Sequence, residues 1–497
     1  MTDLEKKIDE TQEVYSIDWS PEEEAAVRFH IDRTVIPLAL FMYIFAFLDR
    51  VNIGNARAYS LDTKTGLGAM ERDNGMSGND YNMVLSMFFV PYCALEPFSN
   101  LALIRFRPSV WLSRIMLTWG IFSTCMAASG SYAALMTIRI FMGAAEAGLF
   151  PGVAFWLTFW YKPSEISGRI SFFYGGASFA TAFSGLIATG VFYMDGKGGL
   201  AAWRWIFLLE GLPSVILGIV FYFLIPDYPE TCKFLSERER EIAVTRLRVD
   251  PAHAAVKVFK RDEIWPVLRE WQLWVQTAVF LMGITPQYAI AYFQPTILAY
   301  LGYTGVASQW MTVPTTLWNA IGMFFLIVST AQRKYVLFLI ILSNISDRIR
   351  DRSGILICGL FITSIAFVIM ATVWSPPSVA YGMLFVVPAY SATVSLLHGW
   401  VANNHKSHTA RGFAMGLMNG LGGISGAIGG QIYRAADAPH FPIGNSINAG
   451  LLLASAFLAI IVRLTYVLAN RKIDARNAAL VASGAELTEE QKWRYTL

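Results

Sequence analysis

The feature that most constrains this chain is a run of about 20 apolar residues that recurs along almost its whole length. Coiled as an α-helix, such a run matches the hydrocarbon thickness of a lipid bilayer. The composition agrees, since 55% of the 497 residues are hydrophobic and 15% are charged, against about a quarter charged in soluble domains. The sequence therefore predicts an all-α polytopic membrane protein.

Breaks rich in proline, glycine and charge divide these runs into twelve predicted transmembrane helices. Six lie in an N-terminal half, at 34–56, 81–104, 111–130, 133–158, 170–192 and 203–225. Six lie in a C-terminal half, at 271–295, 307–330, 354–373, 379–401, 412–433 and 447–469. The predicted domains are a tail at 1–33, the halves 34–225 and 271–469 joined by a linker at 226–270, and a second tail at 470–497.

Lysine and arginine in short loops predict the orientation, because these residues concentrate on the cytoplasmic side. The loops after the second, fourth and tenth spans contain Arg105, Arg107, Lys162, Arg169, Lys406 and Arg411. The loops near 129–132, 299–306 and 374–378 contain no lysine or arginine. Both termini and the linker are therefore expected in the cytoplasm, although the outer loop 57–80 contains Arg57, Lys64 and Arg72 beside four acidic residues.

The linker contains "LSEREREIAVTRL", which predicts a surface helix lying on the helical bundle. Ser236 and Glu239 have the spacing of a capping box, and Ile242, Ala243 and Leu247 form a short apolar stripe. The C-terminal tail "RKIDARNAALVASGAELTEEQKWRYTL" is polar and is expected to be loosely ordered.

Several classes of function find no support in the sequence. The net charge of +3 is too small to indicate a nucleic-acid partner. His398, His405 and His408 lack zinc-type spacing, no Walker-type glycine loop occurs, and no cofactor is expected. Cys93, Cys125 and Cys358 lie in apolar spans and are interpreted as small core residues rather than disulfide partners. No nucleophile or metal set indicates a membrane enzyme.

Charged residues within the fourth span, "RIFMGAAEAGLFPG", are the strongest indication of a site. A charge at the bilayer centre costs roughly 2.5–3.5 kcal/mol, so it needs a partner or a water-filled cavity. Arg139 and Glu146 are seven residues apart and share one helix face. Gly148 and Gly152 form a small surface that a neighbouring helix can approach, and Pro151 predicts a bend.

The first span supplies complementary charges in "FAFLDRVNIGNA". Asp49 and Arg50 are adjacent, so they point about 100° apart on a helix and address different partners. One arrangement sets Asp49 against Arg139 while Arg50 faces a cavity. Glu96 and Glu210, in the second and sixth spans, are interpreted as structural hydrogen-bond acceptors.

Five motifs in order resemble those of the fungal allantoate-permease-like transporters, which are anion:cation symporters of the major facilitator superfamily. These motifs are "FLDRVNIGNA", "RIFMGAAEAGLFPG", "WRWIFLLEGLP", "IPDYPETCKFLSERERE" and "GLMNGLGGISGAIGG". The likeness covers roughly residues 34–470. It implies two pseudo-symmetric six-helix halves that alternate access to a central cavity, and the import of organic anions with protons. The plasma membrane is the expected location, with the vacuolar membrane also open.

The resemblance also implies roles for individual residues. It assigns Arg50 to the substrate carboxylate and Asp49, Glu146 and Arg139 to proton coupling, with Arg139 switching between the two carboxyl groups. Tyr92 and Asn419 match substrate-contacting positions for which helix packing is an equal alternative. "MSGNDYNMVLSMFFVPYCALEPFSN" leans toward nicotinate-type vitamin carriers, with allantoate, pantothenate and biotin also open, and a transporter-like nutrient receptor is the second class of function.

Two departures from the family pattern concern the C-terminal half. The segment "HKSHTAR" keeps His408, Thr409 and Arg411 in altered surroundings. Between Pro314 and the "SDR" at 346–348 lie 31 residues, more than the family needs, and the apolar part of "QRKYVLFLIIL" is too short to cross about 30 Å of hydrocarbon. An intron retained in the gene sequence is favoured over a cytoplasmic extension of the helix, and activity depends on which is correct.

Overall fold

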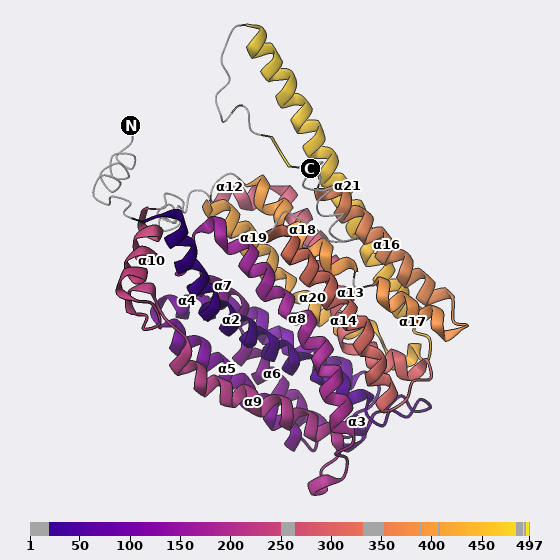
Figure 1. The fold of residues 1–497 in the computed structure, drawn as a ribbon. Coiled ribbons are helices and arrows are strands. Elements are labelled where there is room, and N and C mark those ends of the chain that lie inside the picture. The colour runs from indigo at the N-terminus through magenta and orange to yellow at the C-terminus, as the bar shows by residue number, and fades with distance from the viewer. Residues whose placement is uncertain are drawn as a thin grey trace. The chain divides into compact units, whose positions relative to one another are not determined.

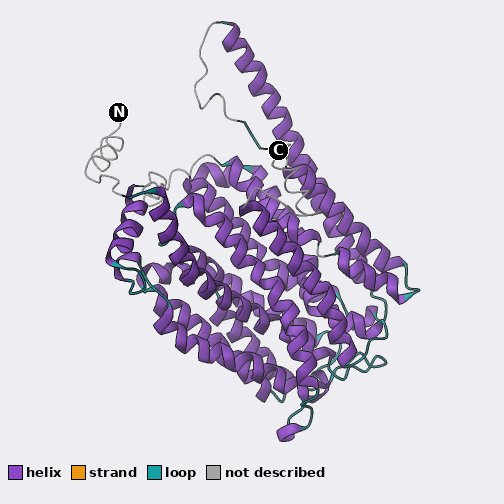
Figure 2. Cartoon of the chain, in the orientation of Figure 1, coloured by secondary structure: helices purple, strands orange, loops and turns teal. Residues whose placement is uncertain are grey.

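The computed structural model describes residues 19–249, 264–331, 352–387, 389–405, 408–483, 491 and 494–496. Within these ranges the chain consists of helices and short loops, with an isolated bridge between Asp62 and Leu67 and no strand (Figure 1, Figure 2). The prediction of an all-α chain is confirmed.

Each predicted span coincides with one helix or with a consecutive pair of helices. The helices before residue 250 are α2 (Pro21–Ala58), α3 (Ala69–Asp73), α4 (Asp80–Arg105), α5 (Pro108–Cys125), α6 (Tyr132–Glu146), α7 (Leu149–Leu157), α8 (Pro163–Phe192), α9 (Ala202–Leu224) and α10 (Glu237–Val249). Those after it are α12 (Ile264–Arg269), α13 (Trp271–Tyr300), α14 (Val306–Ala331), α16 (Arg352–Thr372), α17 (Pro377–Val386), α18 (Ala389–Asn404), α19 (His408–Gly422), α20 (Ile424–Ile432) and α21 (Pro442–Ala482).

Length and composition qualify six stretches of the described chain as membrane spans. They are Pro21–Ala58, Pro108–Ala128, Tyr132–Leu157, Ala202–Leu224, Ser353–Thr372 and Pro442–Ala482. The others fall outside these criteria, and several, such as α4 and α13, contain internal prolines and polar residues.

The chain divides into two compact units. The first comprises Met1–Lys260 and Thr304–Val313, and the second comprises Arg261–Tyr303 and Pro314–Leu497. In the first unit α5 packs along α9, α2 along α8 and α4 along α6; in the second α21 packs along α16 and α13. Residues 304–313, predicted as part of the C-terminal half 271–469, are grouped with the first unit instead.

The first helix begins well before the predicted residue 34, because its start is capped. The Ser20 hydroxyl accepts a hydrogen bond from the Glu23 amide, and the Glu23 carboxylate accepts one from the Ser20 amide. Pro21 occupies the first helical position, and Glu22, Glu23 and Glu24 lie in the first turn. Their negative charges interact favourably with the positive end of the helix dipole. Residues 21–33, expected as a tail, are therefore helical.

The fourth predicted span is broken into α6 and α7 at Gly148, not bent at Pro151. Gly148 has φ 87°, in the left-handed region, which costs a glycine little. Pro151 lies in the first turn of α7, where its missing N–H leaves no helical bond unmade. The break makes Glu146 the last residue of α6. A side chain at Gly148 would also meet Ser99 of α4, which supports the interpretation of close helix approach.

Gly143 allows a still closer approach between α6 and α4. A Cβ at this position would lie 2.0 Å from the Phe88 carbonyl oxygen. We expect Gly143→Ala to separate the two helices and to lower stability by about 1–3 kcal/mol, as overpacking does. Thermal unfolding in detergent measures the loss. Gly190→Ala in α8 is the control, because its Cβ would meet nothing within 4 Å; equal melting of the two variants would contradict this account.

The arginines of the loop 57–80, which departed from the charge pattern, are used within the loop. The Arg57 Nε lies 3.1 Å from the Glu71 Oε1, and both side chains are buried. Arg72 donates hydrogen bonds to the carbonyls of Ser60 and Leu67. Arg57 is therefore paired with a carboxylate, and Arg72 is bound to backbone oxygens.

The predicted linker helix is confirmed as α10. The Glu239 amide donates to the Ser236 hydroxyl at 3.3 Å, and the Ser236 amide donates to the Glu239 carboxylate at 2.9 Å, which completes the capping box. Ile242, Ala243 and Leu247 are buried, and the helix contacts α2.

Two other expectations are corrected. Cys125 and Cys358 are exposed and Cys93 is half-buried, so these three cysteines are not core residues. The tail after residue 469 continues as helix to Ala482. The anomalous segment 332–351, part of the linker (250–263) and the residues 406–407 lie outside the described residues, so the predictions made for them stay predictions.

Candidate functional site

The four charged residues singled out in the first and fourth spans are all buried in the first unit. Asp49 and Glu146 have no exposed surface, and Arg139 and Arg50 are 1% and 7% exposed. Asp49 and Arg50 lie on α2, while Arg139 and Glu146 lie on α6. Since an unpaired charge away from water is costly, the partners of each define what the cluster can do.

Arg50 and Glu146 form an ion pair between α2 and α6. The Arg50 Nη2 donates to the Glu146 Oε1, and the two side chains are 8% and 1% exposed. Water is therefore excluded from one of the strongest kinds of hydrogen bond in proteins, a guanidinium bound to a carboxylate. The pair forms because α6 ends at Glu146 and presents its carboxylate toward α2.

Aromatic rings surround the guanidinium of Arg50. Its Cζ lies 5.1 Å from the ring centre of Tyr92, 5.4 Å from that of Phe88 and 5.8 Å from that of Phe89. All three rings belong to α4, and such distances allow cation–π attraction. Tyr92, expected near the substrate, is therefore in contact range of Arg50, and Glu96 one turn later also interacts with the charge of Arg50.

Arg139 is the second buried cation of this cluster. Its Cζ lies 5.4 Å from the Phe88 ring centre, and its Nη1 lies 3.7 Å from the Met142 sulfur. Its charge also acts on the Glu146 carboxyl. Phe88 thus lies within cation–π distance of both guanidinium groups.

Asp49 points to different helices, and the interpretation that set it against Arg139 is wrong. Its carboxylate accepts hydrogen bonds from the Trp119 indole at 3.0 Å, the Ser123 hydroxyl at 2.6 Å and the Ser214 hydroxyl at 2.5 Å. These donors lie on α5 and α9. The reason is the helical rotation of about 100° per residue, which turns Arg50 toward α6 and Asp49 away from it.

Glu210 behaves as the structural acceptor that the sequence suggested. It is buried on α9 and accepts a hydrogen bond from the Ser184 hydroxyl at 3.3 Å, and Ser184 in turn accepts one from the Asn55 amide at 2.6 Å. Glu210 therefore contributes to packing between α2, α8 and α9.

Asn419 lies in the second unit, on α19. Its amide donates to the Met415 carbonyl at 2.9 Å, and its oxygen lies 3.0 Å from the His398 Nε2 on α18. With the amide nitrogen directed to the backbone, the oxygen accepts, so His398 donates through Nε2. His398 was thus a partner that the sequence analysis missed.

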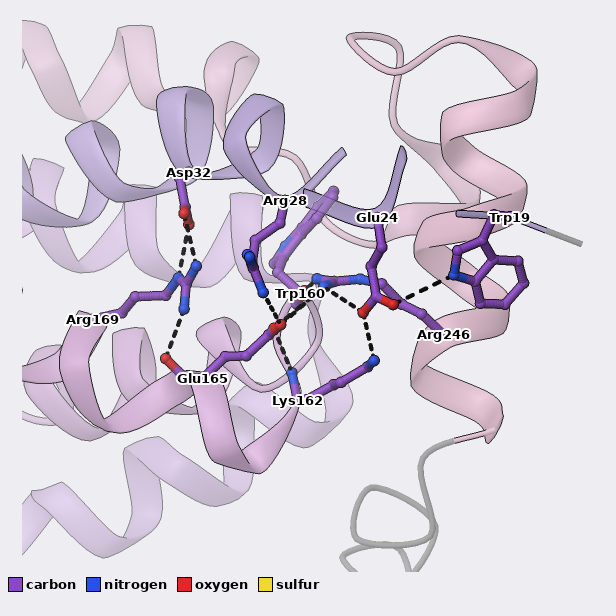
Figure 3. Close-up of polar contacts among 9 residues, drawn as sticks. All are labelled: Trp19, Glu24, Arg28, Asp32, Trp160, Lys162, Glu165, Arg169 and Arg246. Carbon is purple, nitrogen blue, oxygen red and sulfur yellow. Dashed lines mark hydrogen bonds and ion pairs between the residues drawn. The ribbon is translucent and has the colours of Figure 1, made fainter. Parts of the chain in front are cut away.

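A second polar network, near the start of α2, attaches α10 to α2 and α8 within the first unit (Figure 3). The Arg246 side chain of α10 is fully buried; its Nη1 lies 3.2 Å from Glu165 and 3.8 Å from Glu24, and its Nη2 donates to the Trp160 carbonyl. Lys162 donates to Glu24 at 2.5 Å. Glu24 therefore has two cationic partners, Lys162 and Arg246. On α10, a hydrogen bond from His30 lowers the pKa of Glu239.

The sequence did not predict the hydrogen-bond donors to Asp49. It also did not predict the carbonyl and the carboxylates that bind Arg246. Trp119 and Ser123 are four residues apart in an apolar span, so they share a face, and this spacing was the available signal. Arg246 is one of several arginines in a charged helix, and nothing in the sequence separates it from exposed Arg248. No group of three potential metal ligands occurs in the described part of the chain.

Comparison with known proteins places this architecture in a family. The profile of the Major Facilitator Superfamily matches residues 39–430. "MFS transporter prlL" of Fungal sp. (strain NRRL 50135) is 36% identical over 91% of this chain and 88% of its own. "MFS-type transporter cnsO" of Penicillium expansum is 33% identical over 86% and 80%.

Solved structures share the fold at low sequence identity. A bacterial homolog of the human lysosomal transporter Spinster has a TM-score of 0.60 at 15% identity, covering 88% of this chain and 96% of that one. A D-xylose–proton symporter has a TM-score of 0.61 at 12% identity, covering 87% and 97%. From the profile, the relatives and the fold together, the chain belongs to the Major Facilitator Superfamily and is a membrane transporter, not an enzyme.

Proposed function

We propose that the protein is a secondary active transporter that imports a small organic anion together with a proton. The observation that carries this proposal is the buried cluster of Arg50, Arg139 and Glu146, in which two cations share one carboxylate. On the motifs of the sequence we assign the chain to the anion:cation symporters of the allantoate-permease type, and we propose that it works in the plasma membrane.

Charge balance in the cluster supports anion–proton symport. With Asp49 and Glu146 ionised, these two carboxylates offset the charges of Arg50 and Arg139, so the four groups sum to zero. An incoming monoanion would leave an excess negative charge among buried side chains, which is costly. One proton taken up by Glu146 restores neutrality, and this predicts a stoichiometry of one proton per monoanion.

The same proton would release a binding group for the substrate. Neutralising Glu146 removes the charge that holds Arg50, and the guanidinium can then form two parallel hydrogen bonds to a carboxylate. Arg139 adds a second positive charge, and the rings of Tyr92 and Phe88 offer faces to a flat acid such as nicotinate. Asn419, in the second unit, stays a proposed substrate contact on the family resemblance.

Asp49 is the proposed second coupling carboxyl. Its three hydrogen-bond donors come from α5 and α9, so a proton on Asp49 would change the bonds that hold α2 to these helices. In this proposal protonation of Glu146 controls substrate binding, and protonation of Asp49 controls helix packing.

Uptake measurements test the proposal. Expressed in a host that lacks vitamin uptake, the protein should accumulate at least one radiolabelled acid from a panel of nicotinate, allantoate, pantothenate and biotin. Uptake should be faster at acidic external pH and should collapse with a protonophore. Uptake that survives the protonophore would contradict symport, and binding without flux would favour a receptor.

A further inference from the structure

The long helix α21 bears a polar stripe on one face that starts in the last turn of the predicted span 447–469 and continues beyond it. Tyr466, Asn470, Asp474 and Asn477 follow one another at spacings of four, four and three residues, which places them on one side of an α-helix. Tyr466 and Asn477 are each 4% exposed. Something therefore covers this face of α21.

The C-terminal residues of the chain cover it, and the end of the chain lies beside α21 (Figure 1). The Asn477 amide donates to the Gln491 carbonyl at 2.6 Å, and the Arg494 Nε lies 2.5 Å from the Asp474 Oδ1. The Tyr495 ring stacks on the Tyr466 ring, with centres 4.6 Å apart and planes at 7°. Gln491, Arg494 and Tyr495 thus meet α21 in the reverse order of its residues, so the described C-terminal residues, called the docked tail below, run antiparallel to the helix.

Two asparagine side chains each bind the tail backbone at two points. The Asn470 amide donates to the Tyr495 carbonyl at 2.8 Å, and the Tyr495 amide donates to the Asn470 oxygen at 2.9 Å. The Asn404 amide donates to the Thr496 carbonyl at 3.1 Å, and the Thr496 amide donates to the Asn404 oxygen at 2.8 Å. An asparagine can do this because it offers both a donor and an acceptor.

The tail joins two helices, since Asn470 belongs to α21 whereas Asn404 belongs to α18. The Trp400 indole of α18 adds a hydrogen bond of 2.8 Å to the Thr496 carbonyl. Trp400 is fully buried and Asn404 is 7% exposed. The Thr496 backbone therefore supplies hydrogen-bond partners to the polar groups of Trp400 and Asn404, which are buried and need such partners.

We propose that the stripe of α21, together with Trp400 and Asn404, is a peptide-docking site occupied by the chain's own C-terminal residues, and that the docked tail positions α18. The same helix holds His398, which contacts Asn419 at 3.0 Å. His398 and Asn404 are six residues apart, within two turns. Docking of these residues thus acts, through His398, on Asn419, the proposed substrate contact in the second unit.

Cysteine labelling in the full-length protein tests docking directly. Because both asparagines bind backbone atoms, Thr496→Cys retains these bonds and serves as a reporter in a background where the four natural cysteines are serine. Asn470→Leu removes two hydrogen bonds, and we expect maleimide to label Cys at 496 roughly tenfold faster. Asn470→Asp keeps the acceptor and should give an intermediate rate.

Arg471→Leu is the matched control, because Arg471 is the next residue on α21 and is exposed. It should leave the labelling rate unchanged. Equal rates in the Asn470→Leu, Arg471→Leu and unsubstituted proteins would overturn docking, and thermal melting confirms that each variant is folded.

The link to substrate is tested by uptake and rests on the proposed function. Asn470→Leu and Asn404→Leu should raise the KM for the transported acid several-fold more than they change kcat, because α18 loses its anchor while the coupling carboxyl is intact. Faster labelling with an unchanged KM would overturn the role in positioning α18. Absence of uptake by the unsubstituted protein would count against the proposed function, whereas the labelling result would still decide docking.

Discussion

Glu146→Gln is expected to abolish accumulation of the substrate while leaving exchange across the membrane. A proton gradient of one pH unit is worth about 1.36 kcal/mol, so one proton per monoanion supports accumulation of about tenfold per unit. Glutamine keeps the size of Glu146 and its hydrogen bond to Arg50 but cannot take up a proton. Uptake against a gradient should therefore fall to equilibration, and exchange with preloaded acid should persist in proteoliposomes.

Glu210→Gln is the control for this result. Glu210 is a carboxyl as deeply buried as Glu146 in the same unit, and it accepts a hydrogen bond from Ser184 rather than from a guanidinium. It should retain accumulation. Loss of exchange as well as accumulation in Glu146→Gln would assign Glu146 to folding or binding.

Arg50→Lys should weaken binding of the acid, because the two-point geometry of the guanidinium is lost.

Arg246→Met is expected to give the largest loss of stability in the first unit. The Arg246 side chain is fully buried, and Glu165, its partner at 3.2 Å, is 11% exposed. Removing Arg246 takes away the buried cation of Glu165, which keeps only the half-exposed Arg28 at 3.3 Å, and leaves the Trp160 carbonyl without this donor. Breaking a buried pair costs up to about 3–5 kcal/mol. Thermal unfolding measures this loss, and hydrogen exchange should locate it in α10, which loses its attachment to α2 and α8.

Arg248→Met provides the comparison on the same helix. Arg248 is 50% exposed and lies 3.9 Å from Glu230, and exposed pairs of this kind contribute at most about 1 kcal/mol. The double variant Arg246→Met with Glu165→Gln should recover part of the stability, because the carboxylate that had lost its buried partner is gone. Equal melting of the Arg246 and Arg248 variants would contradict the account of Arg246 as a buried anchor.

The helices could be predicted because each follows from a local pattern. Each apolar run coincides with one helix or a pair of helices. The spacing of Ser236 and Glu239 predicted the start of α10. Helix ends were less certain: the capping box at Ser20 was present in the sequence, but the apolar run begins later and was taken as the start of the helix. At the break in the fourth span, proline was chosen as the cause, whereas Gly148 supplies the backbone conformation.

The residues of the candidate site could be named from sequence, but their pairing could not. Buried charges in apolar spans are rare, and this alone selected Asp49, Arg50, Arg139 and Glu146. Which of them meet depends on how each helix is rotated about its axis, and no alternation or spacing in one helix reports the rotation of its neighbour. The neutral donors to Asp49 belong to ordinary residue types, so only the fold reveals them.

The pair of asparagines that bind the chain's end has a practical consequence for anyone who produces this transporter. A fluorescent reporter or affinity tag fused after Leu497 would add bulk within one residue of Thr496, whose backbone is held from two sides. Purification tags and reporters are better placed at the N-terminus, ahead of Ser20. There they would leave Tyr495 and Thr496 bound to Asn470 and Asn404.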